Sequence, residues 1–244
     1  MTIRNKIIAV GMAAITVLHG CGDAQTSDQT VAEQTTGTTS GSRQKATAAT
    51  ETKTILFFGN SLTAGYGLEG TEEAFPALIQ QKIDSLELPY KAVNAGLSGE
   101  TTAGGKSRID WLLKKQQVDV FVLELGANDG LRGISTNETY ANLKAIIEKV
   151  RASNPDVRVV LTGMQMPPSM GQKYTEEFRQ VFTRIAEEEN VALVPFLLEG
   201  VGGVADLNQE DGIHPTAEGQ HILAKNVWAI LGPMLQEQAA ASEV

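Results

Sequence analysis

Short apolar runs alternate with longer amphipathic stretches from Thr54 onward. The runs have the length of buried strands, and the stretches between them repeat apolar residues at helical spacing. We expect strands at residues 55–58, 90–94, 118–125, 157–161 and 191–194. We expect helices at residues 73–86, 101–116, 137–153, 174–189 and 215–231, the last opened by Pro215 at its first position.

Five strands, each followed by a helix, predict an α/β domain with a parallel sheet that is covered by helices on both faces. The strands are almost continuously apolar, which favours this arrangement over a half-exposed antiparallel sheet. Ligands of such sheets bind outside the carboxyl ends of the strands. We therefore expect the chemically unusual residues to follow the strands.

The N-terminal segment does not share this pattern. Arg4 and Lys6 precede an apolar run at residues 7–18, which is too short to span a bilayer and is typical of a secretory signal. Leu18 and Cys21 then resemble a bacterial lipobox, which implies cleavage before Cys21 and a lipid anchor in a membrane. The alternative is an ordinary signal peptide followed by a chance cysteine.

Four segments follow from this interpretation. They are a lipoprotein signal peptide at residues 1–20, a lipid-anchored disordered linker at 21–52, a folded domain at 53–235 and a flexible C-terminal tail at 236–244. The linker nearly lacks large apolar residues and cannot bury enough surface to offset its chain entropy. We expect an exported lipoprotein of the bacterial cell envelope, either facing the periplasm or on the outer membrane.

Charge and cysteine content exclude several classes of partner. The net charge of -9 and the pI of about 4.9 repel phosphate backbones, so we expect no nucleic-acid partner. The single cysteine allows neither an internal disulfide nor a zinc site built from cysteines.

Three candidate residues each follow a predicted strand. Ser61 follows the first strand among small residues, where a tight turn can expose its hydroxyl. Gly99 follows the second strand, and its N–H can face an oxyanion because no side chain blocks a substrate. Asn128 follows the third strand, and its amide can donate to the same oxyanion. Taken alone, Ser61 and Gly99 are better explained as a cap and a turn residue, and Asn128 has the alternative of capping a loop.

Elimination identifies the candidate base among the three histidines. His19 leaves with the signal peptide, and His221 lies within the last predicted helix. His214 stands in a loop three residues after Asp211, whose carboxylate can hold the imidazole in the tautomer that presents a lone pair to a nucleophile. The four loop segments thus supply a nucleophile, two oxyanion donors, a base and its orienting acid at one edge of the sheet.

Ser61, Gly99, Asn128 and His214 resemble the four marker residues of the SGNH (GDSL-type) hydrolases. The resemblance runs from about residue 54 to residue 231. It is strongest to the bacterial periplasmic arylesterase, thioesterase and lysophospholipase group, through the phrases GNSLTAGYG, NAGLSGET, LGANDGLRG, MGQKY and DGIHP. It implies a flavodoxin-like three-layer α/β/α sandwich with a five-stranded parallel sheet.

The resemblance also implies the chemistry. An ester, such as an aryl, thio- or lysophospholipid-type substrate, is hydrolysed through an acyl-enzyme on Ser61, with Asp211 and His214 completing the triad. The N–H groups of Ser61 and Gly99 and the amide of Asn128 form the oxyanion hole. Neither a cofactor nor a metal is implied.

One position departs from the family pattern. The residue before the serine is usually aspartate, and here it is Asn60. Asparagine is nearly isosteric with aspartate and can keep the hydrogen bonds of the turn, but it carries no charge. Activity should survive because the triad acid is expected at Asp211. The local hydrogen bonds and the pH profile are the properties that the change affects.

The loop after the fourth strand is rich in methionine, a residue that adapts to varied apolar partners. One hypothesis is that this loop lines an acyl-binding groove; simple core packing at the base of the loop is the equally weighted alternative. The candidate groove residues are Leu131, Ile134, Met164, Met166, Pro167 and Met170.

Other functions compete with ester hydrolysis. The GGKS phrase at residues 104–107 suggests a phosphate-binding loop, but Glu100 occupies the position where that motif needs glycine. A carbohydrate O-acetyl esterase of the same fold stays open, because substrate choice depends on the shape of the pocket. A catalytically inactive surface binding protein is disfavoured by the intact Ser61, Asp211 and His214.

Overall fold

The computed structural model describes residues 52–242 and contains a five-stranded parallel sheet with the order β2-β1-β3-β4-β5. The predicted α/β class and parallel sheet are confirmed, and each expected strand is present with small shifts at its ends. The strands are β1 at Lys53–Gly59, β2 at Tyr90–Gly96, β3 at Val120–Glu124, β4 at Arg158–Thr162 and β5 at Ala192–Val194. The predicted signal peptide and Cys21 lie outside the described residues.

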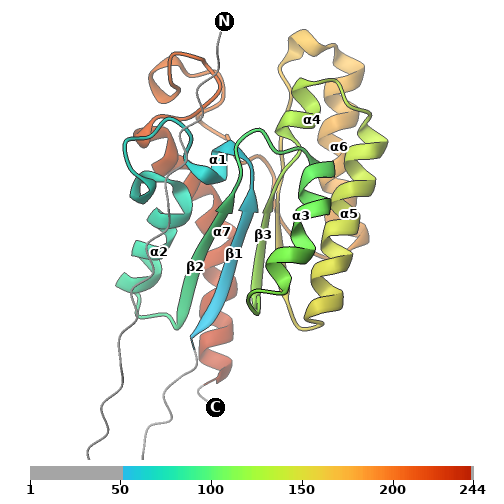
Figure 1. Ribbon diagram of the computed structural model, residues 1–244. Coiled ribbons are helices and arrows are strands. Elements are labelled where there is room, and N and C mark those ends of the chain that lie inside the picture. The colour runs from blue at the N-terminus through green and yellow to red at the C-terminus, as the bar shows by residue number, and fades with distance from the viewer. Residues whose placement is uncertain (1–51, 243–244) are drawn as a thin grey trace, which may run out of the picture. The chain divides into compact units, whose positions relative to one another are not determined.

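Helices cover both faces of the sheet and form a three-layer α/β/α sandwich (Figure 1). On one face α2 (Phe75–Ser85) packs against α7 (Ala217–Ser242). On the other face α5 (Thr136–Ser153) packs between α3 (Thr102–Leu113) and α6 (Gln172–Glu188). Within residues 52–242, no helix is both long enough and apolar enough to cross a membrane.

The central strands are buried because both of their faces are covered. All five residues of β3 and the last five of β1 are buried, whereas the edge strand β2 is mostly part-exposed. The GGKS phrase lies inside α3 rather than in a phosphate-cradling loop. A Cβ atom at Gly105 would approach the Leu125 side chain to 2.4 Å, so glycine allows α3 to lie close to the sheet.

Amide side chains bond to the backbone of the edge strand β2. The Gln80 side chain accepts from the Ala92 N–H and donates to the Tyr90 carbonyl. The Asn94 side chain accepts from the Gly96 N–H and donates to the Thr63 carbonyl. Part of the hydrogen-bonding capacity of this edge is therefore satisfied within the domain.

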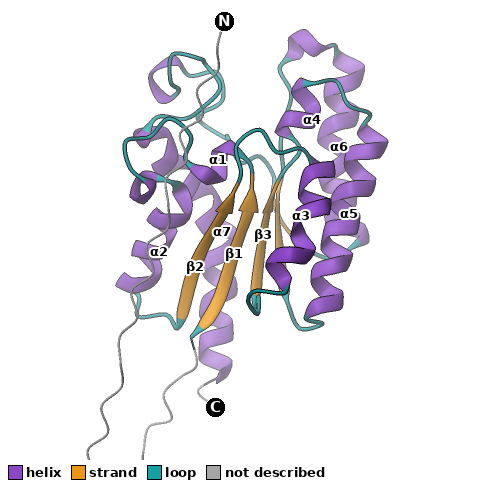
Figure 2. Cartoon of the chain, in the orientation of Figure 1, coloured by secondary structure: helices purple, strands orange, loops and turns teal. Residues whose placement is uncertain are grey.

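All strand arrows point toward the same end of the sheet, where the carboxyl ends of the strands lie, and the loops that follow the strands gather there (Figure 2). Two short helices that the periodicity does not predict begin at this end: α1 at Ser61–Ala64 and α4 at Ala127–Leu131. They are shorter than the window over which a helical repeat can be recognised. Both carry predicted site residues, because Ser61 opens α1 and Asn128 lies in α4.

The final helix does not begin where the sequence predicts. Pro215 forms an antiparallel bridge with Asn208, and the helix begins at Ala217. The Thr216 hydroxyl accepts the Gly219 N–H at 3.3 Å and acts as the cap. The prediction that Pro215 opens this helix is therefore wrong.

The predicted flexible tail at residues 236–244 is wrong as far as Ser242, because α7 continues to that residue. The helix runs through Pro233, a residue that usually ends or kinks a helix. The extension is held to the sheet, since the Tyr90 hydroxyl contacts the Gln238 side chain at 2.9 Å. Arg158 also donates to the Met234 carbonyl at 3.0 Å.

Candidate active site

Three predicted residues form a hydrogen-bonded series at the carboxyl end of β1. Ser61 follows the strand at the first position of α1, and its side chain is largely buried. The Ser61 Oγ lies 2.9 Å from His214 Nε2, and His214 Nδ1 lies 2.6 Å from Asp211 Oδ2. The structure thus joins a serine and a histidine that are 153 positions apart in the sequence, in the order that nucleophile activation requires.

Asp211 is fixed by the loop that it shares with His214. Its Oδ1 accepts the N–H groups of Ile213 at 2.9 Å and His214 at 3.0 Å. The hydrogen bond from the His214 ring, together with these backbone bonds, lowers the pKa of Asp211 to about 2. The carboxylate is therefore ionised at neutral pH and favours the tautomer with a proton on Nδ1, which leaves Nε2 as an acceptor.

Contacts that the sequence did not predict brace this loop. The Gln209 side chain donates to the carbonyls of Tyr66 and Pro215 and so links the loop after α1 to the His214 loop. The Gln209 N–H also donates to the His214 carbonyl at 2.7 Å. The Tyr66 ring lies against the His214 imidazole with 4.6 Å between ring centroids. The imidazole is thus held by contacts on its face as well as on its edge.

Candidate donors for an oxyanion follow the three neighbouring strands β1, β2 and β3. Gly99 has a φ of 80°, a conformation that favours glycine, and its missing side chain leaves open space. Within residues 52–242, the backbone N–H groups of Ser61 and Gly99 have no hydrogen-bond acceptor. The Asn128 amide donates one proton to the Glu100 carbonyl at 3.0 Å, which leaves its second proton for a ligand.

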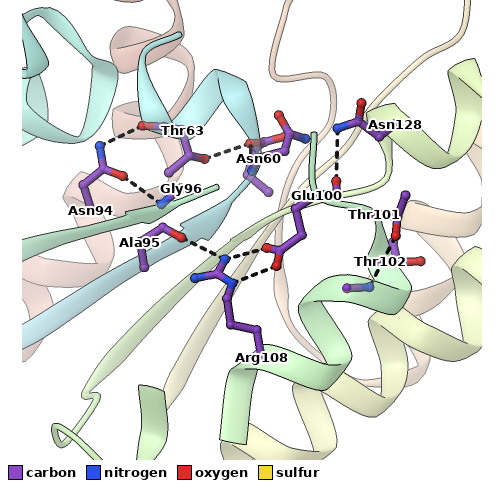
Figure 3. A network of polar contacts seen from close by, with 12 residues as sticks. Asn60, Thr63, Asn94, Ala95, Gly96, Glu100, Thr101, Thr102, Arg108 and Asn128 are labelled. Carbon is purple, nitrogen blue, oxygen red and sulfur yellow. Dashed lines mark hydrogen bonds and ion pairs between the residues drawn. The ribbon is translucent and has the colours of Figure 1, made fainter. Parts of the chain in front are cut away.

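Charged side chains hold the loop that carries Gly99. Figure 3 shows Arg108 on α3 facing both oxygens of the Glu100 carboxylate and the Ala95 carbonyl. The two Arg108–Glu100 bonds measure 2.7 and 2.5 Å, and the Glu100 side chain is buried. Arg132 donates to the Gly99 carbonyl at 3.2 Å. Both ends of the loop are thus tied to neighbouring helices, which fixes the direction of the Gly99 peptide.

An apolar pocket of about 370 Å³ opens next to the triad. Its lining includes Gly212 and Ile213, the two residues between Asp211 and His214. Four of the predicted groove residues also line it: Leu131, Met164, Met166 and Pro167. The other two predicted groove residues do not line it.

Other contacts are recorded for Ile134 and Met170. The Ile134 carbonyl accepts the Tyr174 hydroxyl at 2.8 Å, and Met170 packs against the hydrophobic core from the 3-10 turn Pro168–Met170. The pocket therefore includes four of the six predicted groove residues, and the assignment of Ile134 and Met170 to the groove stays a prediction.

Glu124 is a buried residue near the site that the sequence analysis missed. It ends β3 directly beneath the turn that carries Ser61, and it is buried. The sequence does show an acidic residue at the end of an otherwise apolar strand. Acidic residues are rarely buried unless they are paired or hydrogen-bonded, so this position indicates a buried polar contact. Tyr66 and Gln209 offered no such signal, since their contacts join distant parts of the chain.

Comparison with known proteins places this geometry among the ester hydrolases. A model of the GDSL-like lipase/acylhydrolase family matches residues 57–222, which is more than half of the chain. The esterase TesA of Pseudomonas aeruginosa is 43% identical over 183 residues, which cover 75% of this chain and 90% of the relative.

Two further comparisons agree with this result. The Escherichia coli K12 protein named thioesterase 1/protease 1/lysophospholipase L1 is 35% identical over 186 residues, which cover 76% of this chain and 86% of the relative. The crystal structure of TesA has a TM-score of 0.71 at 42% identity and covers 74% of this chain and 99% of that structure.

The Arg108–Glu100 pair generates a prediction about stability. Arg108→Met should lower the free energy of unfolding by about 3 kcal/mol, because the buried Glu100 carboxylate loses its cation. The added substitution Glu100→Met should recover part of this loss. Arg179→Met is the control, because its pair with Glu176 is solvent-exposed and should leave stability nearly unchanged. Urea unfolding measures all four proteins, and equal losses in Arg108→Met and Arg179→Met would contradict the assignment.

Proposed function

Because the chain belongs to the GDSL-like lipase/acylhydrolase family and is an ester hydrolase, we propose that Ser61 is its nucleophile, His214 its general base and Asp211 the acid that orients the base. The supporting observation is the continuous series from Asp211 through His214 to Ser61, with bonds of 2.6 and 2.9 Å. Each atom in the series has the donor or acceptor character that serine activation needs.

In the proposed first half-reaction, Ser61 Oγ attacks the carbonyl carbon of the ester while His214 Nε2 takes the hydroxyl proton. The former carbonyl oxygen, now negatively charged, accepts hydrogen bonds from the N–H groups of Ser61 and Gly99 and from the Asn128 amide. The tetrahedral intermediate then breaks the bond to the leaving group, which takes the proton from His214. The acyl group stays on Ser61 as an ester.

Water completes the proposed cycle. It gives a proton to His214 Nε2 as its oxygen attacks the acyl carbon, and the same donors stabilise the second oxyanion. Collapse of this intermediate returns the proton to Ser61 Oγ and releases the carboxylic acid. Asp211 stays ionised throughout and stabilises the imidazolium that forms twice in each cycle.

The pocket beside the triad favours substrates with an apolar acyl chain. Its lining is dominated by apolar side chains, including Met164, Met166 and Leu131. Large apolar side chains are also exposed around the site, in loops and at the end of α4: Tyr66, Leu97, Leu131, Val204 and Ile213. We infer that the substrate is amphiphilic, with a lysophospholipid-type ester as the leading class. An acetyl group on a sugar would leave most of this apolar lining unused.

We also propose that the mature protein is a bacterial envelope lipoprotein anchored through Cys21. The supporting pattern is the charged start, the short apolar run and the cysteine that follows it. Acyl chains at this residue would hold the domain at a membrane, where amphiphilic esters are concentrated. The linker at residues 21–52 would then separate the domain from the bilayer.

The nucleophile assignment is tested on p-nitrophenyl esters from acetate to laurate. Ser61→Ala should lower kcat by about 10³-fold or more, because no other group replaces the attacking oxygen. Asn128→Ala should lower kcat by about 10² to 10³-fold, because one oxyanion donor is lost. Ser107→Ala is the matched control, since this hydroxyl bonds within α3. Undiminished turnover in Ser61→Ala would exclude it as the nucleophile.

The pocket assignment is tested with two methionines of the same loop. Met166→Ser should lower kcat/KM for laurate relative to acetate by about tenfold, because it removes apolar contact from the pocket. Met170→Ser should leave this ratio unchanged, because Met170 does not line the pocket. Equal effects of the two changes would show that the pocket does not bind the acyl chain. An optimum at acetate in the wild type would instead favour a carbohydrate O-acetyl esterase.

The anchor is tested by expressing the full chain in bacteria and separating membranes from soluble protein. The wild type should sediment with the membranes, and Cys21→Ser should move esterase activity into the soluble fraction, because serine cannot carry a thioether-linked lipid. Membrane association of Cys21→Ser equal to that of the wild type would contradict the lipid anchor.

A further inference from the structure

The buried carboxylate of Glu124 contacts the turn that carries the proposed nucleophile. Its Oε2 accepts the Asn60 N–H at 3.0 Å and the Thr63 hydroxyl at 2.8 Å. Its Oε1 accepts the Asn60 side-chain amide at 2.8 Å. None of the proposed catalytic steps uses Glu124, although only Asn60 separates it from Ser61 in this series of contacts.

The backbone around Glu124 is shaped to receive this carboxylate. The parallel register places Gly59 opposite Glu124 at the ends of β1 and β3. A Cβ atom at Gly59 would lie 2.0 Å from the Thr63 hydroxyl oxygen and 2.5 Å from Glu124 Oε2. Glycine is therefore required for the carboxylate and the hydroxyl to meet above the strand end.

Burial makes the charge on Glu124 sensitive to its donors. Burial raises the pKa of Glu124 to about 7, and the hydrogen bonds from Thr63 and Asn60 oppose this rise. In the part of the chain that the structure describes, no cation forms an ion pair with Glu124. Its ionised form therefore depends on the three donors from the turn.

The ionised carboxylate determines which way the Asn60 amide faces. It can only accept, so the Asn60 nitrogen must face Glu124 and the Asn60 oxygen must face the other way. That oxygen accepts the Leu62 N–H at 3.0 Å and lies 3.3 Å from Ser61 Oγ. Residue 60 is thus a second acceptor for the Ser61 proton.

Ser61 has one hydroxyl proton and two acceptors within reach. His214 Nε2 lies at 2.9 Å and Asn60 Oδ1 at 3.3 Å. A neutral amide oxygen is a weaker acceptor than a carboxylate oxygen, so it competes less with the imidazole. The side chain at residue 60 therefore influences how often Ser61 donates to its base.

We propose that Glu124 is a positioning residue for Ser61 and acts through Asn60. The Glu124 carboxylate accepts from the nitrogen of the Asn60 amide, and the amide oxygen competes only weakly for the Ser61 proton, so that this proton is left to His214. The proposal rests on the assignment of Ser61 as the nucleophile. It also explains what Asn60 changes relative to the usual aspartate. An aspartate at residue 60 and Glu124 would have to share one proton to form a hydrogen bond, whereas the Asn60 amide carries its donor protons at every pH.

Asn60→Asp tests the role of the amide through the pH dependence of kcat. At neutral pH the carboxyl group introduced at residue 60 and that of Glu124 would hold one proton between them, which imitates the amide. At alkaline pH the shared proton is lost, the two charges repel, and a carboxylate competes for the Ser61 proton. We expect kcat of Asn60→Asp to fall by about tenfold toward pH ~9.5 with KM unchanged, whereas the wild type shows no alkaline fall.

Glu124→Gln creates a mismatch at every pH. Its amide must place a donor against either the Asn60 N–H or the Asn60 side-chain amide, so one hydrogen bond is replaced by two opposed donors. We expect kcat to fall by about tenfold or more across the pH range, because hydrogen bonds to charged groups are among the stronger ones. KM should change little, since Glu124 does not line the pocket.

The double substitution Asn60→Asp with Glu124→Gln restores complementarity. The glutamine oxygen can accept from the residue 60 N–H and from Thr63, while its nitrogen donates to the new carboxylate. We expect kcat to rise about threefold above that of Glu124→Gln and the alkaline fall to disappear, because the charge repulsion is removed, although the carboxylate at residue 60 still competes for the Ser61 proton. A loss of function through general destabilisation would not be repaired by a second substitution in this way.

The experiment measures kcat and KM of the three variants and the wild type from pH ~6 to pH ~9.5, with urea unfolding of each protein. Asp119→Asn is the control, because Asp119 accepts the Thr54 N–H and joins β1 to β3 at the opposite end of the sheet. It should leave the pH profile of kcat unchanged. If Glu124→Gln does not fold, Asn60→Asp still tests the proposal because it keeps Glu124.

Two results would overturn the proposal: a level alkaline profile in Asn60→Asp, or a double variant no more active than Glu124→Gln. Both are distinct from failure of the proposed function, which would appear as activity in Ser61→Ala. An inactive Ser61→Ala together with independent, additive effects at residues 60 and 124 would leave the nucleophile assigned and remove only the positioning role.

Discussion

The hydrogen bonds between Glu124 and the turn after β1 join the neighbouring strands β1 and β3 at the point where both strands end. The register that pairs Gly59 with Glu124 brings the carboxylate under this turn, and Asn60 and Thr63 bond to it from above. The direction in which Ser61 projects follows from this anchor. The base and the oxyanion donors can act in catalysis only when they are correctly placed with respect to that hydroxyl.

The remaining parts of the site are fixed by the same physical means, in which a polar side chain bonds to the backbone of a loop. Arg108 and Arg132 hold the segment around Gly99, and Asn128 bonds to the Glu100 carbonyl next to it. Gln209 links the His214 loop to Tyr66. Reactive groups on loops thereby acquire the rigidity of the sheet and helices to which the loops are tied.

The fold and the reactive residues could be predicted from the sequence because both leave local signals. Strands covered on two faces are continuous apolar runs, and a parallel sheet collects the residues that follow its strands at one edge. The base could be identified because few histidines were available. Supporting residues were harder to find, since Gln209 and Tyr66 act through a contact between segments 143 residues apart.

The errors have equally physical causes. Pro215 and Pro233 are misleading helix signals, because a bridge to Asn208 holds the first outside α7 while α7 continues through the second. Glu124 was overlooked because a search for buried strands counts apolar residues and passes over the single acid at the end.

The amide side chains along β2 have a consequence for the behaviour of the protein in concentrated solution. An exposed edge strand offers free donors and acceptors to which a strand of another molecule can add, and this is a common route to aggregation. Here Gln80 imitates a neighbouring strand by accepting from Ala92 and donating to Tyr90, and Asn94 occupies the Gly96 N–H. The edge is therefore a poorer template for intermolecular pairing than an open strand, because a side chain of α2 already occupies part of it.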